Sequence, residues 1–223
     1  MDAEVKSTMH KVCDVDMEKN ILEENERLAR KNAELFKKNG VRAFNILGAI
    51  GSGKTTVIEQ ISERLDGKKV GAIAGDLTGE DDHLRFKAKG LDSVAINTGK
   101  DCHLDAHYVS HALEDISIEE LDYLFIENVG NLICPVDFPL GTEQEVVIIS
   151  VTEGDDMIRK HPLIFSQSDI TVVNKVDLAD MMDVDISVIE DDFKKVNPHG
   201  TLIKMNAKKG EGIEELMSEL GLP

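Results

Sequence analysis

The chain has 223 residues, of which 43 are Asp or Glu and 25 are Lys or Arg, so its formal net charge is −18. A surface this acidic repels the phosphate backbone of nucleic acids, so we expect no nucleic-acid partner. Hydrophobic residues make up 41% of the sequence, which is enough to build a core and excludes a disordered or fibrous chain.

Apolar runs are short throughout the sequence. A charge or a glycine interrupts them after about six residues, whereas ~18 are needed to span a bilayer, and the first residues hold no apolar signal core. We therefore expect a cytoplasmic protein without membrane contact. The three cysteines, Cys13, Cys102 and Cys134, are scattered and odd in number, which favours reduced thiols or metal ligands over disulfides.

Residues 1–40 form the first predicted element, an N-terminal segment with an amphipathic helix. Apolar residues recur in pairs seven positions apart, at 21–22, 28–29 and 35–36, which places them on one helical face. Asp14 or Asp16 is suited to cap the start and Asn39-Gly40 the end. We predict that the helix packs on the protein's own body; the alternative is a partner-binding or dimerising helix.

From residue 41 to 223 the sequence predicts one further domain of the α/β class. Short apolar runs alternate with helical patterns, which is typical of a three-layer α/β/α fold with a mainly parallel sheet. Ligands of such sheets bind beyond the carboxyl ends of the strands. Strands are expected at 43–47, 70–74, 94–97, 123–126, 146–151, 170–173 and 202–205, and helices at 55–65, 104–113, 186–196 and 213–220.

The loop after the first predicted strand has the spacing of a phosphate-binding P-loop, Gly48-Ala-Ile-Gly51-Ser-Gly53-Lys54-Thr55. Its glycines let backbone N–H groups face the α- and β-phosphates. Lys54 is expected to reach the β- and γ-phosphates, and the Thr55 hydroxyl to bind Mg²⁺. The nucleotide-binding residues predicted here are Gly48, Gly51, Ser52, Gly53, Lys54, Thr55 and Thr56.

The motif Asn174-Lys175-Val176-Asp177 follows the strand at 170–173 and predicts guanine as the base. A carboxylate at Asp177 accepts from guanine N1–H and N2–H₂, donors that adenine lacks. Asn174 would hold the loop and the purine edge, and the Lys175 stem would cover the base. After the last strand, the loop with Ala207 and Lys208 would offer a backbone N–H to guanine O6.

Two acidic loops are expected beside the γ-phosphate. Asp76 ends the second strand and is a candidate to bind Mg²⁺ or orient water, while Glu127 ends the fourth and would hold a Mg²⁺-bound water. The Gly130 N–H would contact the γ-phosphate and sense hydrolysis. We predict Asp81 to lie in a solvated loop and leave open whether Asp82 and Arg85 are switch residues.

Soft and borderline metal ligands form a separate group, Cys102-His103 at the start of a predicted helix and Cys134 before Pro135. They suit Zn²⁺ or Ni²⁺. Three ligands from one chain do not complete a site, so we predict a site shared across a homodimer. His107 and His111 are interpreted as helix surface rather than as secondary ligands, and the isolated pair His10 and Cys13 is left out of the site.

These motifs together resemble the HypB family, the nickel-incorporation GTPases of hydrogenase assembly, in the SIMIBI class of P-loop proteins. The resemblance spans residues 10–223 and rests on GAIGSGKT, GDLTGEDD, NTGKDCHLDAH, ENVGNLICP, EGDD and NKVDL. It implies a GTP-dependent dimer that helps deliver nickel to the large-subunit precursor of [NiFe]-hydrogenase with a zinc-containing partner of the HypA type. It also implies that Cys102, His103 and Cys134 bind metal near the dimer interface.

The sequence departs from relatives in two places. Many have a Cys- or His-rich N-terminal metal segment, where this chain has only His10 and Cys13, and the urease accessory family UreG has His where Asp137 stands here. We predict slow GTP hydrolysis, because no arginine finger is recognisable. The alternatives are a urease-type nickel GTPase, a metal-storage protein that uses GTP structurally, and a small-molecule kinase, which would not need Asn174 and Asp177.

Overall fold

The computed structural model describes the backbone of residues 2–223 and the side chains of residues 19–223. Seven parallel strands form one sheet in the order β3-β2-β4-β1-β5-β6-β7. All seven predicted strands are therefore present, and the predicted parallel α/β class is confirmed. Their bounds are β1 Arg42–Gly48, β2 Val70–Asp76, β3 Asp92–Asn97, β4 Tyr123–Glu127, β5 Gln144–Ser150, β6 Ile170–Asn174 and β7 Thr201–Lys204.

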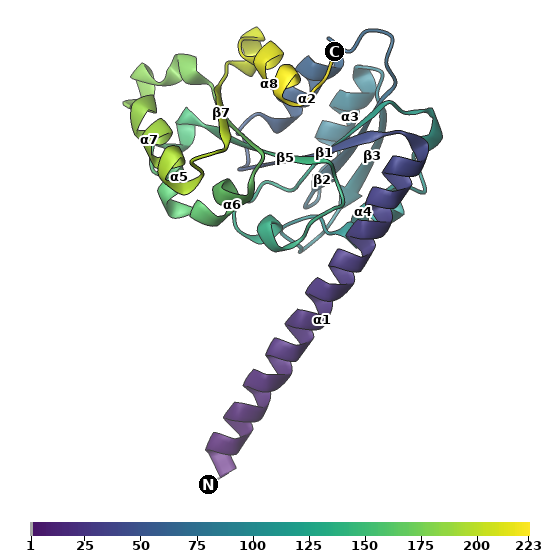
Figure 1. Ribbon diagram of the computed structural model, residues 1–223, viewed down its shortest axis with the longest axis vertical. Coiled ribbons are helices and arrows are strands. Elements are labelled where there is room, and N and C mark those ends of the chain that lie inside the picture. Colours follow the sequence, from purple (N-terminus) through teal and green to yellow (C-terminus); the bar gives the residue numbers. More distant parts are fainter. Residues whose placement is uncertain (1) are drawn as a thin grey trace.

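Helices cover both faces of this sheet (Figure 1). The hydrophobic core on one face joins α2 and α8 to the strands, and on the other face two clusters lie under α4 and under α6 and α7. The helices are α1 Asp2–Asn39, α2 Lys54–Ser62, α3 Asp81–Ala88, α4 Ala106–Ala112, α5 Met157–Lys160, α6 Pro162–Gln167, α7 Ile186–Val196 and α8 Ile213–Glu219.

Three short helices, α3, α5 and α6, come in addition to the predicted ones. The prediction of a loop at Asp81 is wrong, because this residue lies in the first turn of α3. Phe86 is the one buried residue of α3, so the segment has none of the apolar periodicity from which a helix is predicted.

The N-terminal helix α1 packs against α4 with Ala29 and Phe36 buried, in agreement with the prediction that it lies on the protein's own body. It begins at Asp2, so a start at Asp14 or Asp16 is wrong. Its N-terminal part extends away from the α/β body (Figure 1). The contact with the body is therefore made by the C-terminal half of α1.

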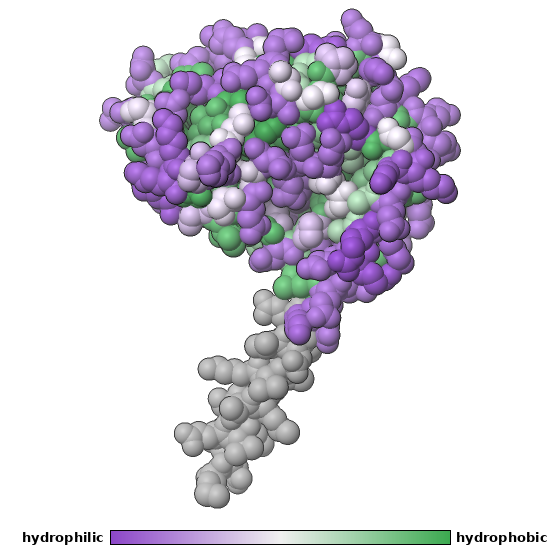
Figure 2. Space-filling model, in the orientation of Figure 1, coloured by the Kyte–Doolittle hydropathy of each residue, from purple (hydrophilic) through white to green (hydrophobic). Residues whose placement is uncertain are grey.

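The face shown in Figure 2 is mainly hydrophilic, in keeping with the acidic composition. Within the described part of the chain, every helix is too short or too polar to cross a lipid bilayer.

Candidate nucleotide and metal sites

The P-loop joins β1 to α2 at the carboxyl edge of the sheet, and its curvature is fixed by β6. Asn174, at the end of β6, donates from Nδ2 to the Ser52 carbonyl at 2.8 Å. Gly53 has φ +105°, and a Cβ there would lie 2.3 Å from Asn174 Nδ2. Only glycine fits this close approach and this left-handed backbone. The base-side motif and the phosphate loop therefore form one unit.

A cavity of about 320 Å³ opens over the P-loop. Lys54 is 6% exposed, and its Nζ lies 3.2 Å from the Ala49 carbonyl and 3.9 Å from Glu127 Oε1. The ammonium group is thus held at the cavity wall by backbone and carboxylate oxygens. A lysine at this place is suited to contact phosphate groups bound in the cavity. The lining includes the P-loop residues Ile50, Gly51, Gly53, Lys54, Thr55 and Thr56, and also Gly75, Asp76, Asp82, Arg85, Glu127, Asn128, Gly130 and Lys175.

Oxygen ligands for a divalent cation meet at the inner end of this cavity. Thr55 Oγ1 lies 2.8 Å from Asp82 Oδ1 and 2.9 Å from Glu127 Oε1, so a single hydroxyl proton is shared between two carboxyl groups. Burial raises the pKa of Glu127 to about 7. Its Oε2 is buried without a hydrogen-bond partner among the described residues. A hydroxyl and carboxylates with unused acceptor capacity fit Mg²⁺.

Asp82 is thus the second carboxylate beside Thr55, and Asp76 is placed differently. Asp76 lines the same cavity, but its two oxygens accept from the backbone N–H of Leu77 at 2.7 Å and of Gly79 at 2.9 Å. Those bonds shape the loop before α3. A role for Asp76 toward Mg²⁺ or water stays a prediction.

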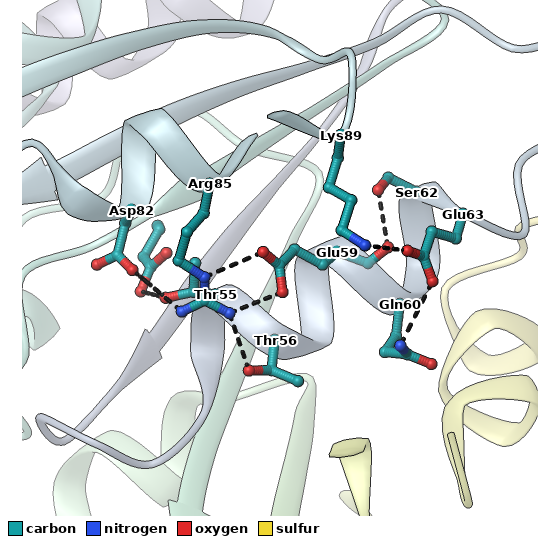
Figure 3. A network of polar contacts seen from close by, with 10 residues as sticks. Thr55, Thr56, Glu59, Gln60, Ser62, Glu63, Asp82, Arg85 and Lys89 are labelled. Atoms are coloured by element: carbon teal, nitrogen blue, oxygen red, sulfur yellow. Dashed lines mark hydrogen bonds and ion pairs between the residues drawn. The ribbon is translucent and has the colours of Figure 1, made fainter. Parts of the chain in front are cut away.

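Arg85, on α3, lines the cavity over the P-loop and reaches across to side chains of α2 (Figure 3). Its guanidinium group donates to both carboxylate oxygens of Glu59, at 3.0 and 2.7 Å, and to Thr56 Oγ1 at 3.2 Å. The ion pair with Glu59 raises the pKa of Arg85. A short loop, residues 77–80, joins β2 to α3. The side chains of Asp82 and Arg85 therefore connect the end of this loop to the P-loop helix α2.

A second cavity, of about 510 Å³, adjoins the first and shares Gly53, Thr56, Arg85 and Lys175 with it. Its lining contains the predicted base-binding residues Asn174, Lys175, Asp177, Ala207 and Lys208. The two cavities together suit an elongated ligand with phosphates at one end and a ring system at the other.

Asn174 connects both loops of this second cavity. Its Oδ1 accepts from the N–H of Lys175 at 2.8 Å and of Ala207 at 3.0 Å. The prediction assigns a backbone N–H of the loop with Ala207 and Lys208 to guanine O6. If the donor is Ala207, its bond to Asn174 must break first. Asp177 lies at the rim, where its Oδ2 is 3.5 Å from Lys209 Nζ.

The predicted metal ligands come together outside the P-loop. One ligand atom each from Cys102, His103 and Cys134 can be chosen so that all lie within 4.8 Å of one another. Burial lowers the pKa of His103, so its ring is neutral and able to bind metal. The Phe138 ring lies against it, tilted by 35°, with centroids 4.1 Å apart. Two thiols and an imidazole suit Zn²⁺ or Ni²⁺.

Cys102 and His103 lie in the loop just before α4, in agreement with the prediction. The helix begins at Ala106 rather than at the predicted residue 104, because Asp105 is the N-cap and accepts from the Tyr108 N–H at 2.9 Å. Cys134 opens the short 3-10 helix η2, Cys134–Asp137. The ligands therefore stand on two separate segments, the loop before α4 and the start of η2.

Asn131 connects the P-loop to both loops that carry the predicted metal ligands. Its backbone N–H donates to the Gly48 carbonyl at 3.1 Å, and its Nδ2 donates to the Cys102 carbonyl at 3.1 Å. Its Oδ1 accepts from the Ile133 N–H, directly before Cys134. Sequence reasoning missed this residue, and the available signal was an asparagine directly after Gly130 and three residues before Cys134.

Gly130 lies against the P-loop, and the space it occupies leaves no room for a side chain. A Cβ at Gly130 would lie 2.3 Å from Ile50 Cγ1 and 2.9 Å from the Ile50 N. This contact brings the Gly130 loop to the edge of the phosphate cavity. Cys134 follows Gly130 by only four residues, so the edge of the cavity and this predicted metal ligand lie close along the chain.

The remaining histidines of α4 lie on its surface. The rings of His107 and His111 contact each other with centroids 4.5 Å apart, and His111 Nδ1 is 3.9 Å from Glu114 Oε1. Neither joins the three-ligand group. The side chains of His10 and Cys13 lie outside the described residues.

Comparison with known proteins places these features in context. The family described as CobW/HypB/UreG, nucleotide-binding domain, matches residues 42–204. A probable hydrogenase maturation factor HypB of Methanocaldococcus jannaschii is 50% identical over 94% of this chain and 95% of its own length.

Two solved structures are also similar over most of their length. The hydrogenase maturation factor HypB of Archaeoglobus fulgidus has a TM-score of 0.83 and 48% identity, over 89% of this chain and 97% of that one. HypB of Helicobacter pylori, solved in complex with nickel, has a TM-score of 0.84 and 32% identity, over 88% and 93%.

Proposed function

Because the chain belongs to the CobW/HypB/UreG family, we propose that it is a GTP-binding and slowly GTP-hydrolysing metallochaperone that assists nickel insertion into [NiFe]-hydrogenase. Its similarity to a hydrogenase maturation factor over 94% of its length, and to a HypB solved with nickel, supports this assignment. The observation that carries it is the short path from the P-loop through Asn131 to Cys102 and Cys134.

Each proposed nucleotide contact belongs to a residue that lines one of the two joined cavities. Lys54 would leave its carbonyl partners for the β- and γ-phosphates, and the Gly130 N–H would contact the γ-phosphate. Asp177 would bind guanine N1–H and N2–H₂. Mg²⁺, held by Thr55 with Glu127 and Asp82, would neutralise phosphate charge during cleavage.

The metal is cargo in this proposal. Cys102, His103 and Cys134 would bind Ni²⁺ or Zn²⁺, and the same residues of a second copy would complete the ligand set in a homodimer. Loss of the γ-phosphate would release the Gly130 loop and alter the distance between Cys134 and the Cys102–His103 pair. Metal would then pass toward the hydrogenase large-subunit precursor, with a HypA-type accessory protein.

The experiment measures GTP hydrolysis and nickel retention together. We load the protein with Ni²⁺ and follow phosphate release and transfer of nickel to a chromogenic chelator, with GTP, a non-hydrolysable analogue or GDP. Nickel should transfer faster after hydrolysis than with the analogue. Equal transfer in all three states would leave metal storage as the better interpretation.

Two variants separate the two activities. Lys54→Ala should fold, because Glu127, with its pKa of about 7, can take up a proton when the lysine is lost, but it should hydrolyse GTP at background rate. Cys134→Ala should hydrolyse GTP and fail to retain nickel. His199→Ala, a loop histidine, serves as the control for both measurements.

A further inference from the structure

The two loops that carry the metal ligands are both contacted by a third element, the N-terminal helix α1. Two of its asparagines, Asn25 and Asn32, are only 4% and 3% exposed. They lie seven residues apart, on the helix face that packs against the body. Buried amides are costly unless every donor and acceptor is paired. The hydrogen bonds of these two residues therefore show what the helix holds.

Asn25 bonds both metal-bearing segments at once. Its Oδ1 accepts from the Ala106 N–H at 2.8 Å, and its Nδ2 donates to the Pro139 carbonyl at 3.0 Å. Ala106 follows His103 by three residues, and Pro139 follows Cys134 by five. One amide thus bridges the segment of His103 and the segment of Cys134.

Asn32 repeats this bridge one heptad later. Its Nδ2 donates to the Ala106 carbonyl at 3.0 Å and to the Leu140 carbonyl at 3.2 Å. Its Oδ1 accepts from the Ser110 hydroxyl at 2.8 Å, which fixes the orientation of the amide. Both asparagines therefore bond the same residue of the first segment and neighbouring residues of the second.

The backbone of α1 also lies directly against the second segment. A Cβ at Gly141 would come within 2.1 Å of the Ala29 carbonyl oxygen. Apolar side chains at both positions would leave the Ala106 N–H and the carbonyls of Pro139 and Leu140 without these partners. Each of the two amides therefore ties the segment of His103 to the segment of Cys134.

We propose that Asn25 and Asn32 are positioning residues of the metal site, which set the separation between the Cys102–His103 pair and Cys134. This inference rests on the proposed function, in which these three residues bind metal. Metal–ligand distances tolerate deviations of only about 0.2 Å. Loops freed from α1 would sample wider separations and bind metal more weakly.

The test uses Asn25→Leu and Asn32→Leu, which replace each amide by an apolar group of similar shape. The full-length protein is titrated with Zn²⁺, Ni²⁺ and Co²⁺, with the thiolate-to-Co²⁺ absorption as the spectroscopic readout. We expect roughly tenfold weaker metal binding, a shifted Co²⁺ spectrum and GTP affinity within about twofold of the starting protein.

Asn39→Leu is the matched control on the same helix. Asn39 Nδ2 donates only to the Leu35 carbonyl of its own last turn, at 2.9 Å, so metal affinity and spectrum should not change. Ser110→Ala is a milder variant that frees the orientation of Asn32 without emptying its place. It should lower metal affinity in the same direction by a smaller factor, and it decides the question if the leucine variants do not fold.

The outcomes separate this inference from the proposed function. If both leucine variants, or Ser110→Ala in their place, keep the affinity and Co²⁺ spectrum of the starting protein while Cys134→Ala loses metal, the asparagines serve stability alone and the inference is wrong. If Cys134→Ala itself keeps the metal, the proposed function is wrong.

Discussion

Asp177 is the residue on which the proposed guanine specificity depends. In Asp177→Asn an amide donor replaces one acceptor, so GTP should bind about a hundredfold more weakly, since each mispaired polar group costs ~1–3 kcal/mol. Xanthosine triphosphate, which has a carbonyl in place of the 2-amino group, should bind better. Titration with fluorescent GTP and XTP measures both affinities.

Asp180→Asn is the control for this change. Asp180 is an exposed acid three residues further along the same loop, and its substitution removes the same charge without touching the base cavity. GTP affinity equal to that of the starting protein in Asp177→Asn would contradict the assignment of the base.

Glu153 should make the free energy of unfolding depend on pH, even without nucleotide or metal. Its Oε1 accepts from the Ser150 N–H at 3.0 Å, its Oε2 is buried without a partner among the described residues, and burial raises its pKa from 4.5 to about 7. Between these values the unfolded chain releases a proton that the folded protein keeps. The free energy of unfolding should therefore fall from pH 4.5 to 7 and then level off.

Glu153→Gln should lose the part of this dependence that Glu153 contributes, because glutamine keeps the acceptor for Ser150 and does not titrate, while the part contributed by Glu127, with its pKa of about 7, remains. The stability of the variant relative to the starting protein should rise over that pH range by on the order of 1–2 kcal/mol, less than the full linkage value of about 3 because the side chain is partly exposed. Urea unfolding of nucleotide-free protein at pH 5, 6, 7 and 8 measures the difference. A difference independent of pH would show that Glu153 is ionised throughout.

At the scale of elements, the sequence predicts those strands, helices and loops whose residues repeat or alternate in a regular pattern. All seven strands follow from short apolar runs, and the P-loop and Asn174 motif follow from fixed spacing at strand ends. The short helix α3 does not follow, because its side chains mostly face solvent. Neither do the roles of Asn25, Asn32 and Asn131, because a single asparagine gives no periodic signal and its partners lie far away in the chain.

Asn131 offers a test of how the two sites are connected. Asn131→Ala keeps the backbone bond to Gly48 but loses the side-chain bonds to the Cys102 carbonyl and the Ile133 N–H. We expect the ratio of metal affinities with a GTP analogue and with GDP to fall toward one, while GTP affinity changes by less than about threefold. Metal titrations in both nucleotide states give this ratio.

Asn197→Ala is the matched control. Asn197 Nδ2 also binds two backbone carbonyls, of Phe165 and Ser168 at 3.0 and 3.1 Å, in a part of the fold away from both sites. The ratio should stay that of the starting protein. An unchanged ratio in Asn131→Ala as well would assign the connection to the Gly130 backbone alone.

At the scale of the whole molecule, the proposed shared metal site makes dimerisation dependent on metal. With a GTP analogue and Zn²⁺ or Ni²⁺, sedimentation should show a dimer, and with GDP and a chelator the equilibrium should shift toward monomer at micromolar protein. Because metal binds the dimer alone in this proposal, the shift should grow with free metal and saturate. Cys134→Ala should remove the metal-dependent part and retain GTP binding.

Cys13→Ala controls for the loss of a thiol, since Cys13 belongs to none of the proposed ligands. It should dimerise as the starting protein does. If Cys134→Ala binds metal as tightly and dimerises as readily as Cys13→Ala, the shared site is wrong and Cys134 is an ordinary thiol.

The bond between the Asn131 N–H and the Gly48 carbonyl anchors the chain three residues before Cys134. One inserted residue would move Cys134 by roughly 3.3 Å along the chain, more than ten times what a metal–ligand bond tolerates. In the proposed metal site, the segment from Gly130 to Cys134 must therefore keep the same number of residues. It should accept changes of side chain at the exposed Ile133 far more readily than any insertion or deletion.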